Sequence, residues 1–421
     1  MKRPLTLAAL AALTLAVAST AAAAEFTPNH LFVGCKNGRI LEFGPGGDYV
    51  KTHIVAQNAE VDRLAFGPDG SLYFSLISQA TVGFLRPDGS VGTALDWTDG
   101  LNNQTDIDFG PDGYLHVCNA TKSEIIKWRP ASGGFPEAKS KMVPEGMGNE
   151  WIHSLSFGPT GDMFITAPGQ TGVSHFNATG QYLDHWYTSE GMVDGVSFTP
   201  GGKMLITKNH NTDKVLMRAF FFSKTFQSSD LDGVGEAICG PDGNVWVASF
   251  IKDRVIKADL SGNQLMTISH PSLDLPTCLA FAPHRFKARL NLKRITASSK
   301  QIKVIENKAV LSITPGSGRL MIALPDDPND DDDAATCLSS PFMVLTGREV
   351  TNGPTEEKRH FTGTSRMPAP LLFGDTTLEL VVRGEADAHG FYAPQKIKGQ
   401  FSEENVVNSL IGTIKANDLL E

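Results

Sequence analysis

Short apolar runs separated by tight turns recur along this chain of 421 residues. The run that ends at Phe66 enters the turn Gly67-Pro-Asp-Gly70, and a second run, Leu72 to Leu76, leaves it. Proline presets the φ that such a turn needs and glycine accepts a positive φ, so each copy predicts a β-hairpin. The copies are led by Phe66, Phe109, Phe157, Phe198, Cys239 and Phe281.

The spacing of these copies predicts the architecture. Successive leading residues are 43, 48, 41, 41 and 42 positions apart, a period typical of four-stranded propeller blades. A further short apolar run follows about 18 residues after each leading residue, as in Val82 to Leu85 and Val255 to Ala258. Each copy therefore holds three clear strands and has room for a fourth.

The two ends of the repeat region complete each other. Residues 28–54 contain three blade strands without an opening strand, and the segment Thr277 to Pro283 is an opening strand with nothing behind it. Joining them completes a blade and leaves no open sheet edge. We predict an all-β chain in which residues 25–285 form a six-bladed β-propeller, closed by N- and C-terminal strands of one blade.

After residue 285 the period stops. Alternation of apolar and polar residues in Val310 to Thr314 and in Leu378 to Val382 predicts strands. We expect residues 286–421 to form a second all-β domain that resembles a sandwich. Between its strands lies the acidic segment Asp326 to Asp333. Its carboxylates could bind Ca²⁺, but the spacing fits no EF-hand, and a solvated loop is the alternative.

Residues 1–24 have the pattern of a secretory signal peptide. A basic start with Lys2 and Arg3 precedes an apolar run and a tail of small residues. We therefore expect a periplasmic or secreted protein. No later stretch has 18 uninterrupted apolar residues, so no membrane span is expected. The formal charge is −9, and without the leader 35 basic residues face 46 acidic ones, which disfavours nucleic acid as a partner.

The first strand of each blade lines the central channel of a propeller, and polar residues begin these strands. Four positions before the leading residues stand Asp62, Thr105, His153, Asp194, Gly235 and Thr277. Alternation puts this position in phase with buried residues, where an apolar side chain would suit packing. We predict a ligand site at the channel mouth, made by Asp62, Thr105, Asp194, Glu236 and Thr277 and supported by neighbours in sequence, Asn103, Asp106 and Glu150.

Two kinds of chemistry fit these residues. Asp62, His153 and Asp194 offer carboxylate and imidazole ligands for one divalent cation, Ca²⁺, Mg²⁺ or Zn²⁺. His153 with the carboxylate of Glu150 could instead act as an oriented general base. The alternative is that these side chains are simply solvated at a wet channel mouth.

The repeats resemble the superfamily of six-bladed propellers that includes NHL proteins, virginiamycin B lyase and gluconolactonase-like enzymes. The similarity covers residues 28–285 and is most marked in Cys239-Gly-Pro-Asp-Gly-Asn-Val-Trp-Val-Ala248. The segment Asp194-Gly-Val196 matches the metal-binding aspartate of the lactonase type, whereas His153 and Thr277 stand where that type has Asn and Glu. His153 also resembles the strand-start histidine of the lyase type, whose catalytic Glu and second His have no counterpart here.

The five cysteines are an odd number for an exported protein. Cys35 and Cys278 lie in the two strands that should join the chain ends, at nearly opposite positions. We predict a Cys35–Cys278 disulfide that locks the ring, with two buried free thiols as the alternative. Cys118 and Cys239 fall in blades on opposite sides of the ring, and Cys337 is alone in the second domain.

Two functions from different classes follow. The first is an exported propeller that binds a small molecule, a protein or a cell-surface polymer at the channel mouth, with or without a divalent ion. The second is a metal-dependent hydrolase or lyase, lactonase-like or virginiamycin B lyase-like, that uses the same residues. The fold does not choose between them.

Overall fold

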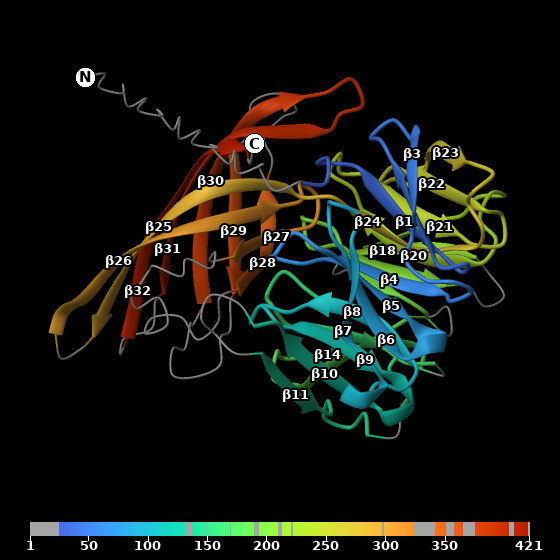
Figure 1. The fold of residues 1–421 in the computed structure, drawn as a ribbon, viewed down its shortest axis with the longest axis horizontal. Coiled ribbons are helices and arrows are strands. Elements are labelled where there is room, and N and C mark those ends of the chain that lie inside the picture. The colour runs from blue at the N-terminus through green and yellow to red at the C-terminus, as the bar shows by residue number, and fades with distance from the viewer. Residues whose placement is uncertain are drawn as a thin grey trace, which may run out of the picture.

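A ring of six sheets and a closed barrel make up the protein in a computed structural model (Figure 1). The structure describes residues 25–131, 137–148, 150–168, 170–188, 193–208, 213–219, 222–296, 299–323, 342–350, 358–364, 375–403 and 408–419. Within these residues almost all regular structure is β, as the sequence predicts.

Each propeller sheet has four antiparallel strands in order from the channel outward. Blade 1 contains β24 (Pro276–Phe281), β1 (Leu31–Cys35), β2 (Arg39–Phe43) and β3 (Tyr49–Ile54). Blade 2 contains β4 (Val61–Phe66), β5 (Leu72–Leu76), β6 (Thr81–Leu85) and β7 (Val91–Leu95). Blade 3 contains β8 (Gln104–Phe109), β9 (Leu115–Asn119), β10 (Glu124–Arg129) and β11 (Ala138–Met142).

The remaining blades follow the same plan. Blade 4 contains β12 (Ser154–Phe157), β13 (Met163–Thr166), β14 (Gly172–Phe176) and β15 (Tyr182–Tyr187). Blade 5 contains β16 (Val196–Phe198), β17 (Met204–Lys208), β18 (Lys214–Ala219) and β19 (Phe222–Phe226). Blade 6 contains β20 (Val234–Cys239), β21 (Val245–Ser249), β22 (Arg254–Ala258) and β23 (Gln264–Ser269). Short 3₁₀ turns are η1 (Ile77–Gln79), η2 (Trp97–Asp99) and η3 (Ala120–Lys122).

The predicted closure of the ring is confirmed. Strand β24 pairs antiparallel with β1, with Leu31 opposite Phe281 and Val33 opposite Leu279. The two chain ends of the propeller thus share one sheet, which removes two open edges at once.

The recurring Asp of the turn motif has a local role. Its Oδ1 accepts a hydrogen bond from the backbone N–H two residues on, as Asp69 does from Ser71 and Asp242 does from Asn244, each at 3.1 Å. The glycine after it takes a positive φ, +85° at Gly70. The side chain therefore stabilises the hairpin between the first two strands of blades 2, 3 and 6, where the motif has Asp.

The C-terminal domain is all-β, as predicted, and its eight antiparallel strands form one closed barrel rather than the two sheets of a sandwich. Its strands are β25 (His284–Thr296), β26 (Ser299–Ile313), β27 (Arg319–Ala323), β28 (Phe342–Val350), β29 (Lys358–Thr364), β30 (Asp375–Ala386), β31 (Tyr392–Glu403) and β32 (Asn408–Leu419). Alternation along each strand is the same in a sandwich and in a barrel. The pairing of β25 with β32, far apart in sequence, decides closure.

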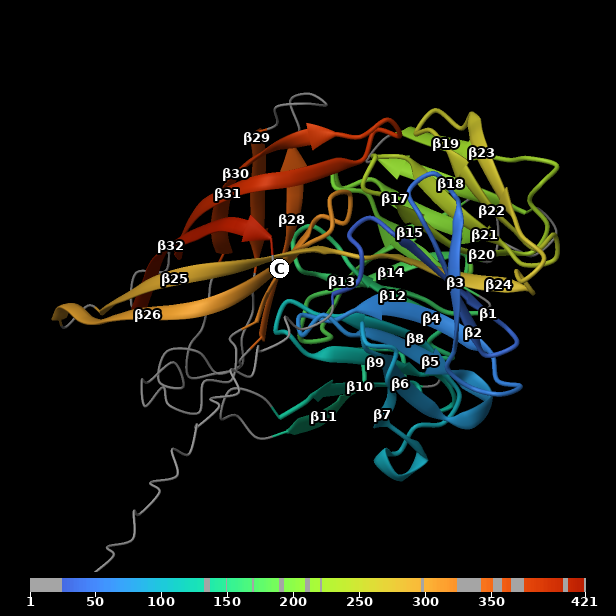
Figure 2. The same cartoon turned by 45° about the horizontal axis from the view of Figure 1, so that its top comes forward.

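The barrel docks on one end of the propeller (Figure 2). Met321 of β27 and Val344 of β28 pack into the apolar cluster of blades 1 to 3. Phe391, beside β31, joins the cluster of Trp246 and Phe281. The first barrel strand, β25, begins at His284.

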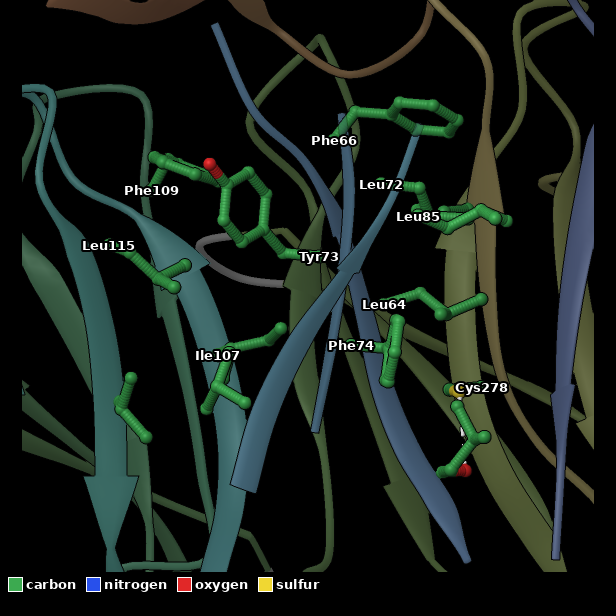
Figure 3. Close-up of a cluster of buried hydrophobic side chains, with 14 of the residues drawn as sticks. Leu64, Phe66, Leu72, Tyr73, Phe74, Leu85, Ile107, Phe109, Leu115 and Cys278 are labelled. Carbon is green, nitrogen blue, oxygen red and sulfur yellow. Dashed lines mark hydrogen bonds between the residues drawn. The ribbon is translucent and has the colours of Figure 1, made fainter. Parts of the chain in front are cut away.

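The predicted Cys35–Cys278 disulfide is not formed, and both residues are buried free thiols. The regular register of β1 with β24 places Gly34, not Cys35, opposite Cys278, and a bulge beyond this pair puts Cys35 opposite Pro276. The two cysteines also belong to clusters on opposite faces of blade 1. Figure 3 shows the Cys278 sulfur beside Leu64 and Phe74 of blade 2. A Cβ on Gly34 would lie only 2.4 Å from that sulfur, so glycine is needed there.

Three sequence predictions lie outside the described residues. They are the signal peptide at 1–24, the acidic segment at 326–333 and the position of Cys337. Export to the periplasm or beyond therefore stays a prediction. Among the described residues there is no helix with the length and apolar character to cross a membrane.

A buried carboxylate in blade 1 predicts a loss of stability in acid. Glu42 accepts hydrogen bonds from His30 Nδ1 at 2.7 Å and from His53 Nε2 at 3.2 Å. Burial acts to raise the Glu42 pKa, but the histidines and Lys51 outweigh it and lower the pKa to about 2. A carboxyl group whose pKa is lower in the folded than in the unfolded state stabilises the fold at pH values above its unfolded-state pKa. This stabilisation is lost as the pH falls toward the folded-state pKa.

We expect the free energy of unfolding to drop by about 2 kcal/mol between about pH 5 and about pH 3 through Glu42. Urea unfolding at several pH values measures it. The Glu42→Gln variant should show a shallower fall over the same range, because its side chain does not titrate. An equal slope in both proteins would contradict the assignment.

Candidate functional site in the central channel

The six inner strands surround a cavity of about 160 Å³. Residues of β4, β8, β12, β16, β20 and β24 line its wall, and the turn between β26 and β27 of the barrel, with Ser317 and Arg319, lines one end. The barrel therefore contributes side chains to a cavity that is otherwise built by the propeller.

Bulges at the starts of four inner strands decide which polar side chains enter the channel. The pairing register shifts at Asp62 and Arg63 in β4, at Thr105 in β8, at Gly235 and Glu236 in β20, and at Thr277 in β24. One extra residue shifts the alternation of side chains by one position. The sequence prediction assumed unbroken alternation from the residue four positions before each leading residue to the buried positions. It fails at these four strands because the bulges interrupt that alternation.

Arg63 and Asp106 form a buried ion pair in the channel. The Arg63 Nε lies 3.4 Å from Asp106 Oδ1, and Arg63 Nη1 donates to the Asp62 carbonyl at 2.8 Å. Burial would lower the pKa of Arg63, but the charges of Asp106, Asp62 and Glu236 raise it. The guanidinium is thus a fixed positive charge within the ring.

The Asp106 carboxylate also connects blade 3 to blade 4. Its Oδ2 accepts from Ser154 Oγ at 2.6 Å and from the Leu155 backbone N–H at 2.9 Å. Burial raises its pKa, while Arg63 and these donors oppose the rise. Because β12 has no strand on its channel side, such side chains satisfy its free backbone donors.

Glu236 is the second carboxylate of this group. It lines the cavity, and its Oε2 accepts from the Leu279 N–H at 2.8 Å. Burial raises the pKa of Glu236 to about 8, against the opposing charge of Arg63 and with help from Asp106. At neutral pH the carboxyl group therefore holds a proton and can donate it.

Asp108 and Arg319 close the barrel end of the cavity. The Arg319 guanidinium makes a two-pronged ion pair with both carboxylate oxygens of Asp108. Burial would lower the pKa of Arg319, but Asp108 more than compensates and raises it. This pair joins the barrel to the inner strand of blade 3 inside the channel.

The structure places two predicted ligand residues between blades. Thr105 Oγ1 donates to the Ile152 carbonyl at 2.9 Å, and Thr277 Oγ1 donates to the Val61 carbonyl of blade 2. Both are buried, and neither lines the cavity. Gly235 allows a close approach, since a Cβ there would lie 2.3 Å from the Thr277 carbonyl oxygen.

The predicted metal ligands are Asp62, His153 and Asp194, which precede or begin inner strands and are all half-buried. His153 Nδ1 is 2.9 Å from the Asp194 carbonyl oxygen, so Nδ1 carries a proton and donates it to that oxygen. Among the described residues no group of three or more His, Cys, Asp or Glu is placed to hold a metal ion. The role of these three residues as ligands of one divalent cation stays a prediction.

Glu150 and Asn103 lie on loops rather than in the cavity. The Glu150 N–H donates to the Met147 carbonyl, and the Asn103 carbonyl accepts from the Ala120 N–H. The pairing of Glu150 with His153 in general base chemistry stays a prediction.

Three functional residues were missed by the sequence reasoning, Arg63, Asp108 and Arg319. Charges inside otherwise apolar inner strands are the signal that could have identified Arg63 and Asp108, in Val61-Asp-Arg-Leu-Ala-Phe66 and Thr105-Asp-Ile-Asp-Phe109. Nothing local identifies Arg319, because its role depends on how the barrel docks.

Comparisons with known proteins find similar solved structures but no sequence relative. No family model and no curated protein matches the sequence. Similar solved structures include a protein of unknown function from Bacteroides caccae, 14% identical over 60% of this chain and 98% of that one, with a TM-score of 0.47. Virginiamycin B lyase from Staphylococcus aureus, determined as a catalytically inactive form with quinupristin, is 10% identical over 86% and 97%, with a TM-score of 0.43.

A putative gluconolactonase is also similar, 13% identical over 61% of this chain and 90% of that one, with a TM-score of 0.46. These are the kinds of protein that the repeats resemble. At such identities and scores they carry no argument about activity.

Proposed function

We propose that the protein binds a small organic cation in the central channel, between the inner strands and the β26–β27 turn. The observation that carries the proposal is the set of charges around the cavity. Among the described residues, three carboxylates (Asp106, Asp108, Glu236) and the Arg319 guanidinium line the cavity, and the Arg63 guanidinium pairs with Asp106 beside it.

When all three carboxylates are ionised, these five side chains carry three negative and two positive charges. Arg319 pairs with Asp108 and Arg63 pairs with Asp106, which leaves Glu236 without a full charge partner. In a desolvated site such a carboxyl group takes up a proton. A ligand that brings a protonated amine would replace this proton and complete the charge balance.

The size of the cavity limits the ligand. A cavity of about 160 Å³ is comparable with cavities that hold one benzene-sized molecule. Apolar side chains such as Leu64, Ile107 and Val196 share the lining. The fitting ligand is therefore a compact amine with an apolar body, not a polymer segment.

The test uses cyclohexylamine, with cyclohexanol as its neutral and cyclohexanecarboxylate as its anionic counterpart. Titration calorimetry at neutral pH should detect binding of cyclohexylamine but no binding of cyclohexanol or cyclohexanecarboxylate. Binding should release about one proton from Glu236, seen as a dependence of the heat on the buffer's ionisation enthalpy. Glu236→Gln should weaken amine binding by about tenfold or more.

The control is Asp88→Asn, at an exposed turn of blade 2, which should bind the amine as the unmodified protein does. Equal binding of cyclohexanol and cyclohexylamine, or full amine binding by Glu236→Gln, would show that the charge group is not the ligand site.

A second candidate function is the predicted hydrolase or lyase activity. Glu236 would then serve as the general acid or base, in place of the predicted mouth residues. The supporting observation is a protonated carboxyl group that faces a cavity and can give or take a proton near neutral pH. Hydrolysis of γ-butyrolactone, with and without Ca²⁺, Mg²⁺ or Zn²⁺, tests it. A rate that changes near pH 8 and is lost in Glu236→Gln supports catalysis; an unchanged rate in that variant opposes it.

A further inference from the structure

A second, larger pocket of about 580 Å³ lies at the outer rim of blade 4, away from the channel. It is lined by β14, by β15, by the loop that leads from blade 3 into blade 4, and by the loop between β13 and β14. All of its lining residues are among those that the structure describes. Its volume is within the range of pockets that enclose a small ligand.

The pocket has an apolar floor and aromatic walls. Met147 and Phe176 are buried beneath it. Tyr182 and Tyr187 of β15 stand at its sides with 46% and 71% of their surfaces exposed. Exposed aromatic rings of this kind present an apolar face and a polar tip to a ligand.

A chain of hydrogen bonds fixes the polar groups of the pocket. Ser174 Oγ donates to Gln170 Oε1 at 3.1 Å and lies 3.1 Å from His185 Nδ1. A hydroxyl has one proton, so the His185 Nδ1–H must donate to Ser174. Burial lowers the pKa of His185, which favours the neutral ring, and Nε2 is then an acceptor.

This arrangement favours binding over nucleophilic catalysis. Activation of Ser174 would require an unprotonated nitrogen facing its hydroxyl. Here the facing nitrogen holds the proton, and the serine proton points to Gln170. The chain therefore orients the side chains and leaves no activated nucleophile among them.

We propose that this pocket binds a neutral sugar unit, either free or at the end of a polysaccharide chain. A sugar ring offers C–H faces that pack on the tyrosine rings and hydroxyls that donate to His185 Nε2 and to the Glu145 carboxylate. Glu145 is already held in place at the rim, where its Oε2 accepts from the Tyr182 N–H at 3.0 Å. No lysine or arginine lines the pocket and the His185 ring is neutral, so an anionic ligand would find no counter-charge.

The test measures binding of cellohexaose, maltohexaose and chitohexaose by titration calorimetry, and of insoluble cellulose and chitin by co-sedimentation. At least one soluble probe should bind. Tyr187→Ala should weaken it by about tenfold, and Tyr187→Phe should retain most of the affinity because it keeps the ring. Co-sedimentation with the matching polymer distinguishes a polysaccharide end from a free sugar.

The matched control is Trp97→Ala, since Trp97 of blade 2 is also 71% exposed and lies outside the pocket. It should bind normally. The proposal is overturned if no probe binds, if Tyr187→Ala binds as well as the unmodified protein, or if Trp97→Ala loses as much. Loss in Glu236→Gln with full binding in Tyr187→Ala would place the sugar in the channel and also overturn it.

Discussion

Replacing Trp246 by alanine is expected to lower the free energy of unfolding by about 3–5 kcal/mol. The side chain is 1% exposed, and its ring packs edge-on against Phe281 at 5.4 Å and tilted against Phe391 at 6.5 Å between centroids. The Lys257 ammonium lies 5.2 Å from the ring centre. Alanine would leave a cavity where blade 6, blade 1 and the barrel meet.

Urea unfolding measures the effect, with near-ultraviolet circular dichroism to check that each variant is folded. Trp246→Phe should cost less, because a smaller ring still fills part of the space. Phe391→Ala should cost less than Trp246→Ala, since it removes only the barrel's share of the contact. Trp97→Ala, at an exposed position, should change stability very little. If Trp246→Ala lowered the free energy of unfolding no more than Trp97→Ala does, the contact between blade 6, blade 1 and the barrel would not stabilise the fold.

Replacing Arg319 by methionine is expected to cost about 3 kcal/mol of stability. Methionine keeps much of the side-chain volume but leaves the buried Asp108 without its charge partner. The Phe109 N–H, at 2.9 Å from Asp108 Oδ1, is too little compensation for a desolvated carboxylate. The loss should appear mainly in the contact between barrel and propeller.

A matched double variant also removes the charge of Asp108, which Arg319→Met leaves without a partner. Arg319→Met combined with Asp108→Asn should recover a large part of the lost stability, because the amide is neutral and keeps a hydrogen-bond acceptor. Lys252→Met, which breaks an exposed pair with Asp232 at 3.6 Å, should cost less than about 1 kcal/mol. A double variant as unstable as Arg319→Met would argue that geometry, not charge, is responsible.

The propeller was predictable because its signals are local and repeated. The Pro-Asp-Gly turn is encoded by a proline φ, a positive-φ glycine and an Asp that bonds its own backbone. The unmatched strands at the two ends of the repeat region specified the β24–β1 pairing. Repetition multiplies each weak local signal, so the blade count was reliable.

The channel was predicted only in part. Glu236 was predicted at the site itself and Asp106 beside it, and both line the cavity. Thr105 and Thr277 turn away from it, because alternation was extended through bulges that a sequence pattern does not reveal. The Cys35–Cys278 bridge failed because the regular register of β1 with β24 pairs Cys278 with Gly34, one residue from Cys35, so the two cysteines lie on opposite faces of blade 1.

By itself, then, the sequence determined the blades, their number, the closure of the ring and the strand content of the C-terminal region. These depend on residues close together in the chain or on one unmatched pair of ends. Only the tertiary structure decided that β25 meets β32 to close a barrel, that Arg319 pairs with Asp108 in the channel, and that Arg63 lies close enough to Asp106 and Glu236 for its charge to act on both. These features join residues far apart in the chain, where contact depends on packing and on single-residue shifts in strand register.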